Sequence, residues 1–577
     1  MKDAISLLTV PFFLLKIFKI DFTHHPEVVG DFFCKGPKVS AWQTDEVKMK
    51  KNDEIELDIA DTGNEGEGIG RYDGMPFFVK GAVVGDRILA GVTKLKKTYG
   101  YARLVKVITP SPFRVIPPCP IAGKCGGCQL QSIAYEKQLE IKESKVYNDL
   151  VRLGKISADR LINPEDVFSG KDPKEIPDSR LTDEKTVYFH KIIGMSDTCH
   201  YRNKGQFPVG LDKEGRVVTG FYAGHTHSII PTEKCMIQHE LTDGIMETVR
   251  AFMEKYGISA YVECGGTVRH ILTRVGFRTH EVMVCVVING QSLPHWQELK
   301  DMLEACVENY NTQMAEDNKS IPGFRLDGDD TSNIKYRLAS FSVNINTENT
   351  NVILGDKVKT LYGDPYITDY IGDLKYRISP LSFYQVNPVQ TLKLYHTALK
   401  YAVKPLRYVE DSSEKDLTDS FTEDISGKTV WDLYCGIGTI SLFMARKAKK
   451  VYGVEIVPQA IEDAKKNAEI NGITNAEFIC GAAEEVMPAK FAEDPELRTD
   501  VIVVDPPRKG CDEKLLATIV KMEPERIVYV SCDPATLSRD VAYLEDQGYI
   551  LKEVQPVDQF PYSSHVETVC WLKKDHR

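Results

Sequence analysis

The sequence has no apolar run long enough to cross a bilayer. Its most apolar stretch, residues 4–20, contains Pro11 and is interrupted by Lys16 and Lys19, whereas a membrane-spanning helix needs about 20 consecutive apolar residues. No A-x-A-like cleavage site follows, so residues 1–48 are interpreted as an extension of unknown role rather than as a signal peptide. We expect a cytoplasmic protein with no membrane partner.

Two further features are missing: an excess of positive charge and a regular spacing of cysteines. The formal net charge is -11, which argues against a protein that coats nucleic acid non-specifically but allows a local basic face. The 14 cysteines fall at irregular intervals, which is typical of reduced thiols with a metal-binding or catalytic use and not of a disulfide scaffold. There is no internal repeat, and no obligate protein partner is predicted, so we expect a monomer.

Composition and length indicate a soluble globular protein of several domains. Hydrophobic residues make up 42% and charged residues 27% of the 577 residues, which are ordinary values for a folded soluble chain. A chain of this length exceeds what a single hydrophobic core normally supports. We therefore predict a multi-domain α/β protein with an N-terminal OB-like β-barrel, a mixed α/β central domain that carries a cysteine loop, and a C-terminal doubly wound Rossmann-like domain.

The first domain is predicted at residues 49–109. Its apolar residues alternate, as in Ile55, Leu57 and Ile59, and glycines punctuate the stretch, a pattern of short strands in a small barrel. Residues 94–103 interleave cations with tyrosines. That mixture suits attraction to phosphate and stacking on bases, although a solvated strand face would have the same composition.

The other boundaries follow from changes of pattern along the chain. Residues 129–154 have apolar residues near helical spacing and are predicted as a helix packed on the catalytic domain. The central domain is assigned to the residues on either side, 110–128 and 155–377. Within it, residues 155–187 are charged and proline-rich and are interpreted as a linker or insertion. The C-terminal domain is assigned to residues 378–577.

The C-terminal domain has the rhythm of a doubly wound parallel sheet. After a polar segment at residues 411–426, short apolar runs alternate with segments of helix length. The runs are 430–433, 451–455, 501–504 and 527–530. In such folds ligands bind at the carboxyl ends of the strands, so these ends are where we expect the site.

The first two strands of that sheet predict a site for a nucleoside cofactor. The first ends in a turn with Gly436 and Gly438, and the second ends in Glu455. The glycines let the backbone turn tightly and approach a ligand, and an acid at that strand end can accept both ribose hydroxyl hydrogens. A dinucleotide site would have a third glycine where this chain has Ser441. The fourth strand ends in a D-P-P turn that begins at Asp505, and this turn resembles that of methyltransferases that act on planar nitrogens or nucleobases. Both observations favour S-adenosylmethionine over NAD.

A cysteine and an acid at strand ends predict the chemistry. Cys532 ends the strand that follows the D-P-P turn, and Glu567 lies on the final strand. Carbon 5 of uracil becomes nucleophilic only after a thiolate adds to carbon 6, and a base must then remove the carbon 5 proton. We predict Cys532 as the nucleophile and Glu567 as the base, because a partly dry site can raise the pKa of a glutamate toward the operating pH. A buried structural cysteine and an exposed strand glutamate are the alternatives for each residue taken alone.

With these motifs in order, the chain resembles the TRAM-domain-containing RNA (uracil-5-)-methyltransferases, and among them those that modify 23S ribosomal RNA. The resemblance covers residues 49–577. It places the nucleophile in S-C-D-P at 531–534, where the family has S-C-N-P, and the base in H-V-E at 565–567. It also implies that the barrel is a TRAM domain and that S-adenosylmethionine is contacted by Gln385, Tyr434, Gly436, Glu455 and Asp505.

The resemblance also assigns a use to the cysteine loop. Cys119, Cys125 and Cys128 lie close together in the sequence, and Cys235 lies where the family has a fourth ligand. Four thiolates suit a [4Fe-4S] cluster. Zinc is the alternative metal, because four cysteines also satisfy it, and Cys199 is the competing fourth ligand. A role in structure or in positioning RNA is expected for the cluster.

RNA is the expected partner, with ribosomal RNA as the substrate and transfer RNA as the alternative. Arg202 and Lys204, in a motif that resembles one near the family's RNA-facing surface, are expected RNA contacts. The target uridine would have to leave its stack to reach Cys532. An amino-methyltransferase would need an aromatic residue where Arg508 follows the D-P-P turn. An inactive Fe-S RNA-binding protein would have lost the cysteine, the acid or the glycine turn.

Overall fold

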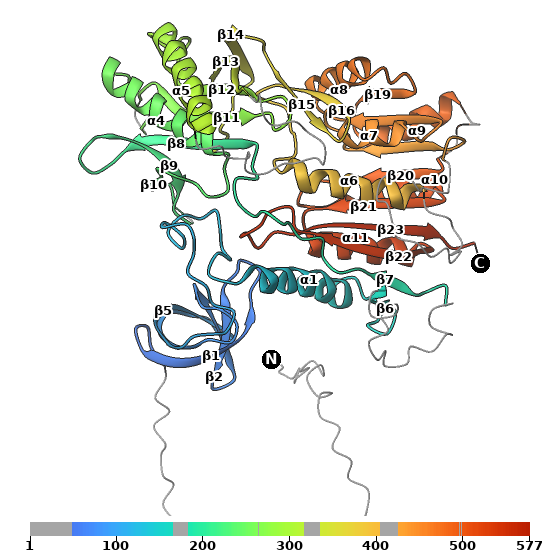
Figure 1. Cartoon of the computed structure of the whole chain (residues 1–577). Helices are drawn as coiled ribbons and strands as arrows, with labels where there is room; N and C mark the ends of the chain where they lie inside the picture. The colour runs from blue at the N-terminus through green and yellow to red at the C-terminus, as the bar shows by residue number, and fades with distance from the viewer. Residues whose placement is uncertain are drawn as a thin grey trace, which may run out of the picture. The chain divides into compact units, whose positions relative to one another are not determined.

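The computed structural model describes residues 49–164, 183–224, 226–262, 265–316, 335–403, 425–494, 497 and 499–576. The predicted extension at 1–48, the middle of the insertion near 155–187 and nearly all of the polar segment at 411–426 lie outside the described residues. The chain from Lys50 to Arg577 forms one compact unit. Along this unit a barrel, a central sheet and a C-terminal sheet follow one another (Figure 1).

The N-terminal domain folds into a closed five-stranded barrel, which confirms the predicted barrel. The strand order is β1-β2-β3-β5-β4, and Ile55, Leu57 and Ile59 of β1 are buried. Close packing requires glycine at one point, because a Cβ on Gly100 would lie 2.3 Å from the ring of Phe77. The strands are β1 Glu54–Thr62, β2 Gly68–Tyr72, β3 Met75–Lys80, β4 Arg87–Leu95 and β5 Gly100–Thr109.

A mixed seven-stranded sheet with two helices forms the central part of the unit. Its order is β10-β9-β8-β11-β12-β13-β14, and only β12 and β13 of these neighbours pair in parallel. α4 buries Ile245, Val249 and Phe252 on one helical face and ends at Gly257, which is left-handed. The elements are β8 Lys204–Leu211, β9 Val217–Tyr222, β10 Ile229–Pro231, α4 Glu240–Tyr256, β11 Val268–Val275, β12 Glu281–Ile288, α5 Trp296–Glu316, β13 Arg337–Ile345 and β14 Lys357–Gly363.

A nine-stranded sheet forms the C-terminal part, in the order β19-β18-β17-β20-β21-β23-β22-β7-β6. The neighbours from β19 to β21 are parallel, whereas β23 runs antiparallel between β21 and β22. The elements from α6 onward are α6 Pro388–Val403, β17 Thr429–Leu433, α7 Thr439–Ala445, β18 Lys450–Glu455, α8 Pro458–Ile470, β19 Ala476–Cys480, α9 Ala483–Glu493, β20 Val501–Val504, α10 Glu513–Met522, β21 Arg526–Ser531, α11 Pro534–Asp546, β22 Tyr549–Val557 and β23 Glu567–Lys574.

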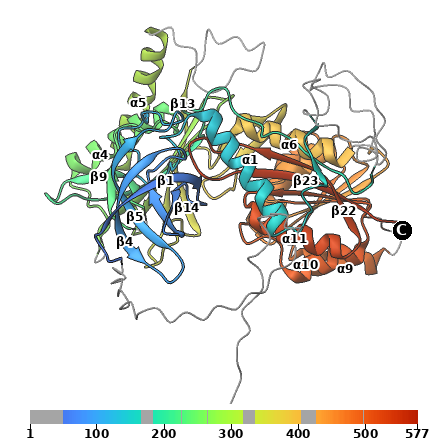
Figure 2. The same ribbon diagram turned by 90° about the horizontal axis from the view of Figure 1, so that it is seen from below.

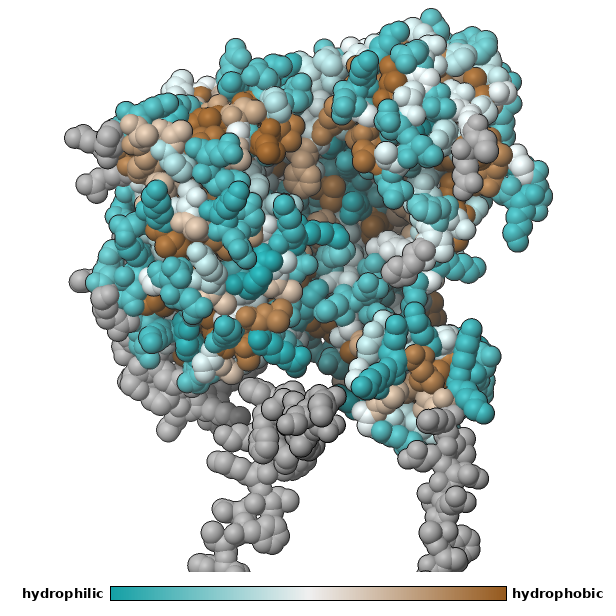
Figure 3. All heavy atoms as spheres, turned by 180° about the vertical axis from the view of Figure 1, so that it is seen from behind, coloured by the Kyte–Doolittle hydropathy of each residue, from teal (hydrophilic) through white to brown (hydrophobic). Residues whose placement is uncertain are grey.

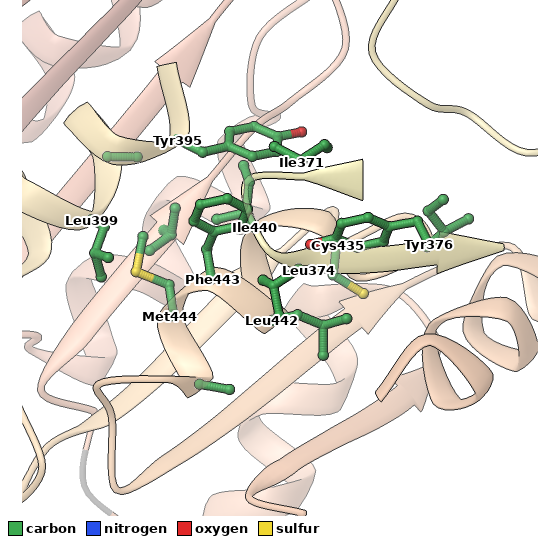
Figure 4. Packing of buried hydrophobic residues seen from close by; sticks show 14 of the residues in the cluster. Ile371, Leu374, Tyr376, Tyr395, Leu399, Cys435, Ile440, Leu442, Phe443 and Met444 are labelled. Carbon is green, nitrogen blue, oxygen red and sulfur yellow. The ribbon is translucent and has the colours of Figure 1, made fainter. Parts of the chain in front are cut away.

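The apolar runs in these strands are explained by a core on each face of the sheet. Val503 and Val528 lie in one core with residues of α6, α7 and α8, among them Phe443 (Figure 4). Val504 and Tyr529, the next residues along the same strands, lie in a second core with residues of α9, α10 and α11. Strands that are covered on both faces need apolar residues at successive positions.

The C-terminal sheet includes segments that the sequence analysis assigned elsewhere. β6 (Leu161–Ile162), within the predicted linker, and β7 (Val187–Phe189), at its end, were both assigned to the central domain but extend the C-terminal sheet beyond β22. The hairpin of β15 (Ile367–Ile371) and β16 (Leu374–Ile378), assigned to the central domain, packs on α6 and α8 and adds Tyr376 to the first core (Figure 4). A short strand carries no local signal for the sheet it joins, because its partner is distant in sequence.

α1 (Tyr135–Arg152) lies along the C-terminal sheet, in contact with α11 and β22 (Figure 2). Its buried residues are Gln138, Lys142, Val146 and Leu150, which recur at every fourth position and so share one face. Two of these four side chains, Gln138 and Lys142, are polar, and Lys142 is also the charged one. A helix that buries such groups must supply them with partners.

In the parts of the chain that the structure describes, no helix is long and apolar enough to cross a membrane. The apolar stretch at residues 4–20 lies outside those parts. On the face drawn in Figure 3, hydrophobic side chains are scattered among hydrophilic ones.

Candidate active site

The pairing of two strands at the carboxyl edge of the C-terminal sheet sets the positions of Cys532 and Glu567. β21 ends at Ser531, which pairs with Thr568 of the antiparallel strand β23, and the next residues outward are Cys532 and Glu567. Asp505 follows β20, the strand on the other side of β21. The charges of Glu567 and Asp505 both act on the Cys532 thiol. The sheet therefore brings three reactive groups from three strands to one place.

Burial dominates the electrostatics of these groups. Glu567 is 3% exposed, and burial, followed by the charge of Asp505, raises its pKa to about 8. Burial raises the pKa of Asp505 to about 7. The pKa of the half-buried Cys532 thiol is raised to about 11, by burial and then by the two carboxyls, while Arg508 opposes the shift at both Cys532 and Glu567. Glu567 can therefore exchange a proton near neutral pH.

Asp533 holds the turn on which Cys532 sits. Its side chain accepts hydrogen bonds from the backbone N–H groups of Ala535 (2.9 Å) and Thr536 (3.3 Å) and so caps α11. Pro534 occupies the first helical position, where a missing N–H costs nothing. The departure from S-C-N-P therefore places an equally good capping residue beside the thiol.

The glycine-rich turn after β17 adopts an unusual backbone. Tyr434 (φ 71°), Gly436 (φ 55°) and Gly438 (φ 83°) all lie in the left-handed region, which is strained for a tyrosine. A Cβ on Gly438 would lie 3.0 Å from the ring of Phe478, whereas a Cβ on Gly436 would meet nothing within 4 Å. Gly438 is therefore required by packing, and Gly436 borders open space.

Ser441, which replaces the third glycine of a dinucleotide site, has a partner in the first strand. Its hydroxyl donates to the buried carboxyl of Asp432, whose pKa burial raises to about 7. The turn is also tied to α6, because the Tyr395 hydroxyl and Thr439 Oγ1 are 3.0 Å apart. Figure 4 shows Tyr395 beside the start of α7.

The predicted cofactor residues lie at three separate locations in the structure. Glu455 accepts hydrogen bonds from the N–H groups of Gly436 (3.3 Å) and Val457 (2.9 Å), so Tyr434, Gly436 and Glu455 lie together at the ends of β17 and β18. Asp505 lies with the Cys532 and Glu567 pair. Gln385 is buried just before α6, where its backbone carbonyl accepts a hydrogen bond from Asn203 (3.0 Å).

The four predicted cluster ligands line one cavity. Cys119, Cys125, Cys128 and Cys235 all border it, with apolar neighbours such as Ile121, Phe221 and Ile237. Cys199 lies instead next to Tyr562 and Asp197. Among the described residues, however, no group of three or more His, Cys, Asp and Glu side chains is arranged to hold a metal ion. The predicted metal centre is therefore not confirmed.

Sequence reasoning missed the part that Arg508 plays in the site. Its guanidinium lies 3.4 Å from Nε2 of His565 and acts on Cys532 and Glu567. The D-P-P-R turn was noted in the sequence, but nothing local indicates which way its arginine points. Sequence reasoning also missed the residues that hold the connection between β22 and β23, residues 558–566, because those partners lie far away in the sequence.

The overall fold is that of a methyltransferase. It is similar to the structure of the tRNA (uracil-54, C5)-methyltransferase of Pyrococcus abyssi in complex with S-adenosyl-L-homocysteine. The similarity has a TM-score of 0.61 at 23% identity and covers 90% of this chain and 100% of that chain.

Sequence comparisons identify the family. Residues 418–575 match the tRNA (Uracil-5-)-methyltransferase family, and residues 48–105 match the TRAM domain. An uncharacterized RNA methyltransferase of Halalkalibacterium halodurans is 44% identical over 527 residues, which cover 91% of this chain and 98% of the relative. One of Clostridium tetani is 41% identical over 530 residues, with shares of 91% and 98%. The chain belongs to the TRAM-domain-containing, S-adenosylmethionine-dependent RNA (uracil-5-)-methyltransferases, which confirms the predicted family and enzyme class.

Proposed function

We propose that this protein methylates carbon 5 of a uridine in RNA through a covalent bond between Cys532 and carbon 6, with Glu567 as the base. The observation that supports this most is the pairing of β21 with β23, which puts a thiol and a buried carboxyl side by side at the ligand edge of the sheet. One nucleophile and one base near neutral pH are what the chemistry requires.

The steps balance with these residues. S-adenosylmethionine supplies an electrophilic methyl group. The Cys532 thiol loses its proton to water, a step that the nearby charge of Arg508 favours. The thiolate attacks carbon 6, which forms a C–S bond and moves an electron pair to carbon 5. Carbon 5 takes the methyl group, and the sulfonium that carried it would leave as a neutral thioether. Ionised Glu567 then removes the proton from carbon 5, and the electron pair that this releases breaks the C–S bond and frees the thiolate.

Contacts to the cofactor are proposed for the residues at the ends of β17, β18 and β20. Glu455, whose carboxylate is held by two backbone N–H groups, would accept hydrogen bonds from the ribose. Tyr434 and Gly436 would border the cofactor at the strained turn, and Asp505 would face its reactive end beside Cys532. Gln385 would contribute from the loop before α6.

Two surfaces support RNA as the substrate. On the barrel, the rings of Phe78, Tyr99 and Tyr101 form a cluster with centroids 5.6 to 5.8 Å apart, and aromatic clusters of this kind stack on bases. In the central sheet, Lys204 lies close to Arg202, and burial together with neighbouring cations lowers its pKa to about 7. A phosphate bound beside these cations would favour the charged form of the lysine.

Within RNA, we propose 23S ribosomal RNA as the substrate; the TRAM domain and the four cysteines at one cavity support this choice. Transfer RNA is the second candidate, because the matching family model and the Pyrococcus abyssi enzyme both carry tRNA in their names. Ribosomal RNA is therefore the first substrate to test, and transfer RNA is the second.

A [4Fe-4S] cluster held by four cysteines is also part of the proposal. The support is that the thiols converge on one cavity with apolar walls. A zinc ion would need all four sulfur atoms about 2.3 Å from one centre, whereas a cluster takes one thiolate on each iron and accepts a wider spacing. It would link the loop at 119–128 to Cys235 and stabilise the central domain.

The cluster is tested by iron and sulfide analysis of protein purified without oxygen. Cys235→Ser should lose most of the iron, and Cys199→Ser, the matched control, should retain it. Equal iron in the two variants would overturn the assignment of Cys235, and zinc in place of iron would overturn the cluster.

The catalytic proposal is tested by trapping. Wild-type and Cys532→Ala protein are incubated with S-adenosylmethionine and 5-fluorouridine-substituted RNA, either ribosomal or transfer RNA, and separated on a denaturing gel. Fluorine at carbon 5 is not removed by a base, so the covalent complex should persist in the wild type alone. A complex only with transfer RNA would keep the mechanism and overturn the substrate. No complex with either RNA, despite bound cofactor, would overturn the proposed activity in favour of an RNA-binding role.

A further inference from the structure

The connection between β22 and β23, residues 558–566, ends directly at Glu567. Glu567 is the first residue of β23 and pairs with Val557 of β22, so the connection closes the end of the hairpin from which the carboxyl of Glu567 enters the site. Tyr562 in this connection has a φ of 69°, a left-handed conformation that costs energy for a bulky side chain. A backbone of this kind persists only where the surrounding structure imposes it.

α1 supplies a buried ion pair to this connection. Lys142 Nζ lies 2.5 Å from Asp558 Oδ1, with the two side chains only 1% and 0% exposed, and it also donates to the carbonyl of Phe560 at 3.0 Å. The hydroxyl of Tyr135 donates to the other Asp558 oxygen at 2.8 Å and accepts the N–H of Met195 at 2.9 Å. Both oxygens of the carboxylate are therefore held by residues of α1.

Further contacts hold the strained part of the connection. The side-chain oxygen of Gln138, also in α1, accepts the N–H of Tyr562 at 3.1 Å, and the N–H of Leu130 donates to the Tyr562 carbonyl at 2.8 Å. On the other side, Gln390 of α6 donates to the carbonyl of Asp558 at 3.0 Å. The connection is thus fixed between α1 and α6.

The geometry assigns α1 as the positioning element for the catalytic base: Tyr135 and Lys142, acting through Asp558, set the connection that aims Glu567 at carbon 5. This inference rests on the proposed function. Cys532 takes its position from β21 and from the cap of α11 instead, whereas the hydrogen bonds of Tyr135 and Lys142 go to Asp558, Phe560 and Met195. Disturbing the ion pair should therefore impair proton removal and leave thiol addition and methyl transfer intact.

Trapping separates these steps. A complex with 5-fluorouridine RNA forms without the base, whereas release of ordinary methylated uridine requires it. We expect Asp558→Asn to form the fluorouridine complex at the wild-type rate but to lower turnover of ordinary RNA about 100-fold. Tyr135→Phe, which keeps the ion pair and removes one hydrogen bond to a charged group, should lower turnover about tenfold. Both should accumulate a methylated covalent complex with ordinary uridine, as Glu567→Gln should.

Glu545→Gln is the matched control. It breaks a partly buried ion pair, in which Arg160 Nη2 and Glu545 Oε1 are 2.7 Å apart and the side chains are 19% and 20% exposed, but does not touch the connection. It should accumulate no covalent complex with ordinary uridine.

The positioning role is overturned if Asp558→Asn and Tyr135→Phe slow complex formation and turnover equally, because the pair then only supports the fold. Should Asp558→Asn fail to fold, Tyr135→Phe decides alone. No fluorouridine complex in the wild type would overturn the proposed function itself, an outcome distinct from a failure of these variants alone.

Discussion

Replacing the proposed base with glutamine should make the protein more stable at alkaline pH. Burial raises the pKa of Glu567 from 4.5 to about 8, so the carboxyl must be neutral to remain in its place below that pH. The unfolded chain ionises it above about pH 4.5. The contribution of this group to the free energy of unfolding is fully present below about pH 4.5. It is lost as the pH rises through about 8, because the unfolded chain then binds fewer protons than the folded one.

The magnitude follows from the two pKa values. A difference between 4.5 and about 8 corresponds to about 5 kcal/mol in the free energy of unfolding. Glutamine fills the same space and carries no charge at any pH. The advantage of Glu567→Gln over wild type should therefore grow by about this amount from about pH 4.5 to about pH 8 and then level off.

Urea unfolding followed by tryptophan fluorescence across this pH range measures the difference. Cys532→Ala is the control, because it changes the same site but keeps the carboxyl, and its difference from wild type should stay nearly constant. A constant difference for Glu567→Gln would show that the carboxyl ionises freely in the folded protein. It would then not be the buried acid on which the proposed base role depends.

Three further predictions concern catalysis and binding. Release of methylated uridine from the covalent complex should become about tenfold faster per pH unit up to about pH 8 and then level off, because this step needs ionised Glu567 as its base while the thiol is already bonded to carbon 6; a release rate that is flat from pH 6 upward would exclude Glu567. Glu455→Ala should weaken S-adenosylmethionine binding about tenfold in calorimetry and leave RNA binding unchanged, since a hydrogen-bonded carboxylate is lost; unchanged cofactor affinity would exclude a ribose contact. At pH 6, below the Lys204 pKa of about 7, Lys204→Gln should weaken RNA binding and reduce the slope of log affinity against log salt by about 1; an unchanged slope would mean that Lys204 meets no phosphate.

Local patterns were sufficient for the elements that carry the site. The alternation of Ile55, Leu57 and Ile59 predicts a strand of the barrel, and the structure places all three inside it. The glycine turn before Ser441 and the acid at Glu455 were identified because tight turns restrict which residues they accept. These signals are read from neighbouring residues alone.

Local patterns do not predict which side chains are buried or which strands pair when the partners are distant in sequence. Nothing in the sequence indicates that β6 and β7 join the C-terminal sheet. Every exposed edge strand offers the same unpaired N–H and C=O groups, so the backbone alone does not select a partner. The direction in which Arg508 points, and the burial that raises the pKa of Glu567, depend on side chains from several elements. A pKa is a property of the surroundings and not of the residue.

The sequence by itself determined the family and the enzyme class, because the motifs that identify them are specified by residue type and by their place at strand ends, whereas the roles of Cys532 and Glu567 stay predictions. Only the tertiary structure decided which groups meet. Cys235 shares a cavity with the loop that carries Cys119, and Lys142 reaches Asp558 across 416 positions of the chain. The reason is physical: turn and strand preferences act over a few residues, whereas a buried charge is stable only with a partner that folding brings from elsewhere.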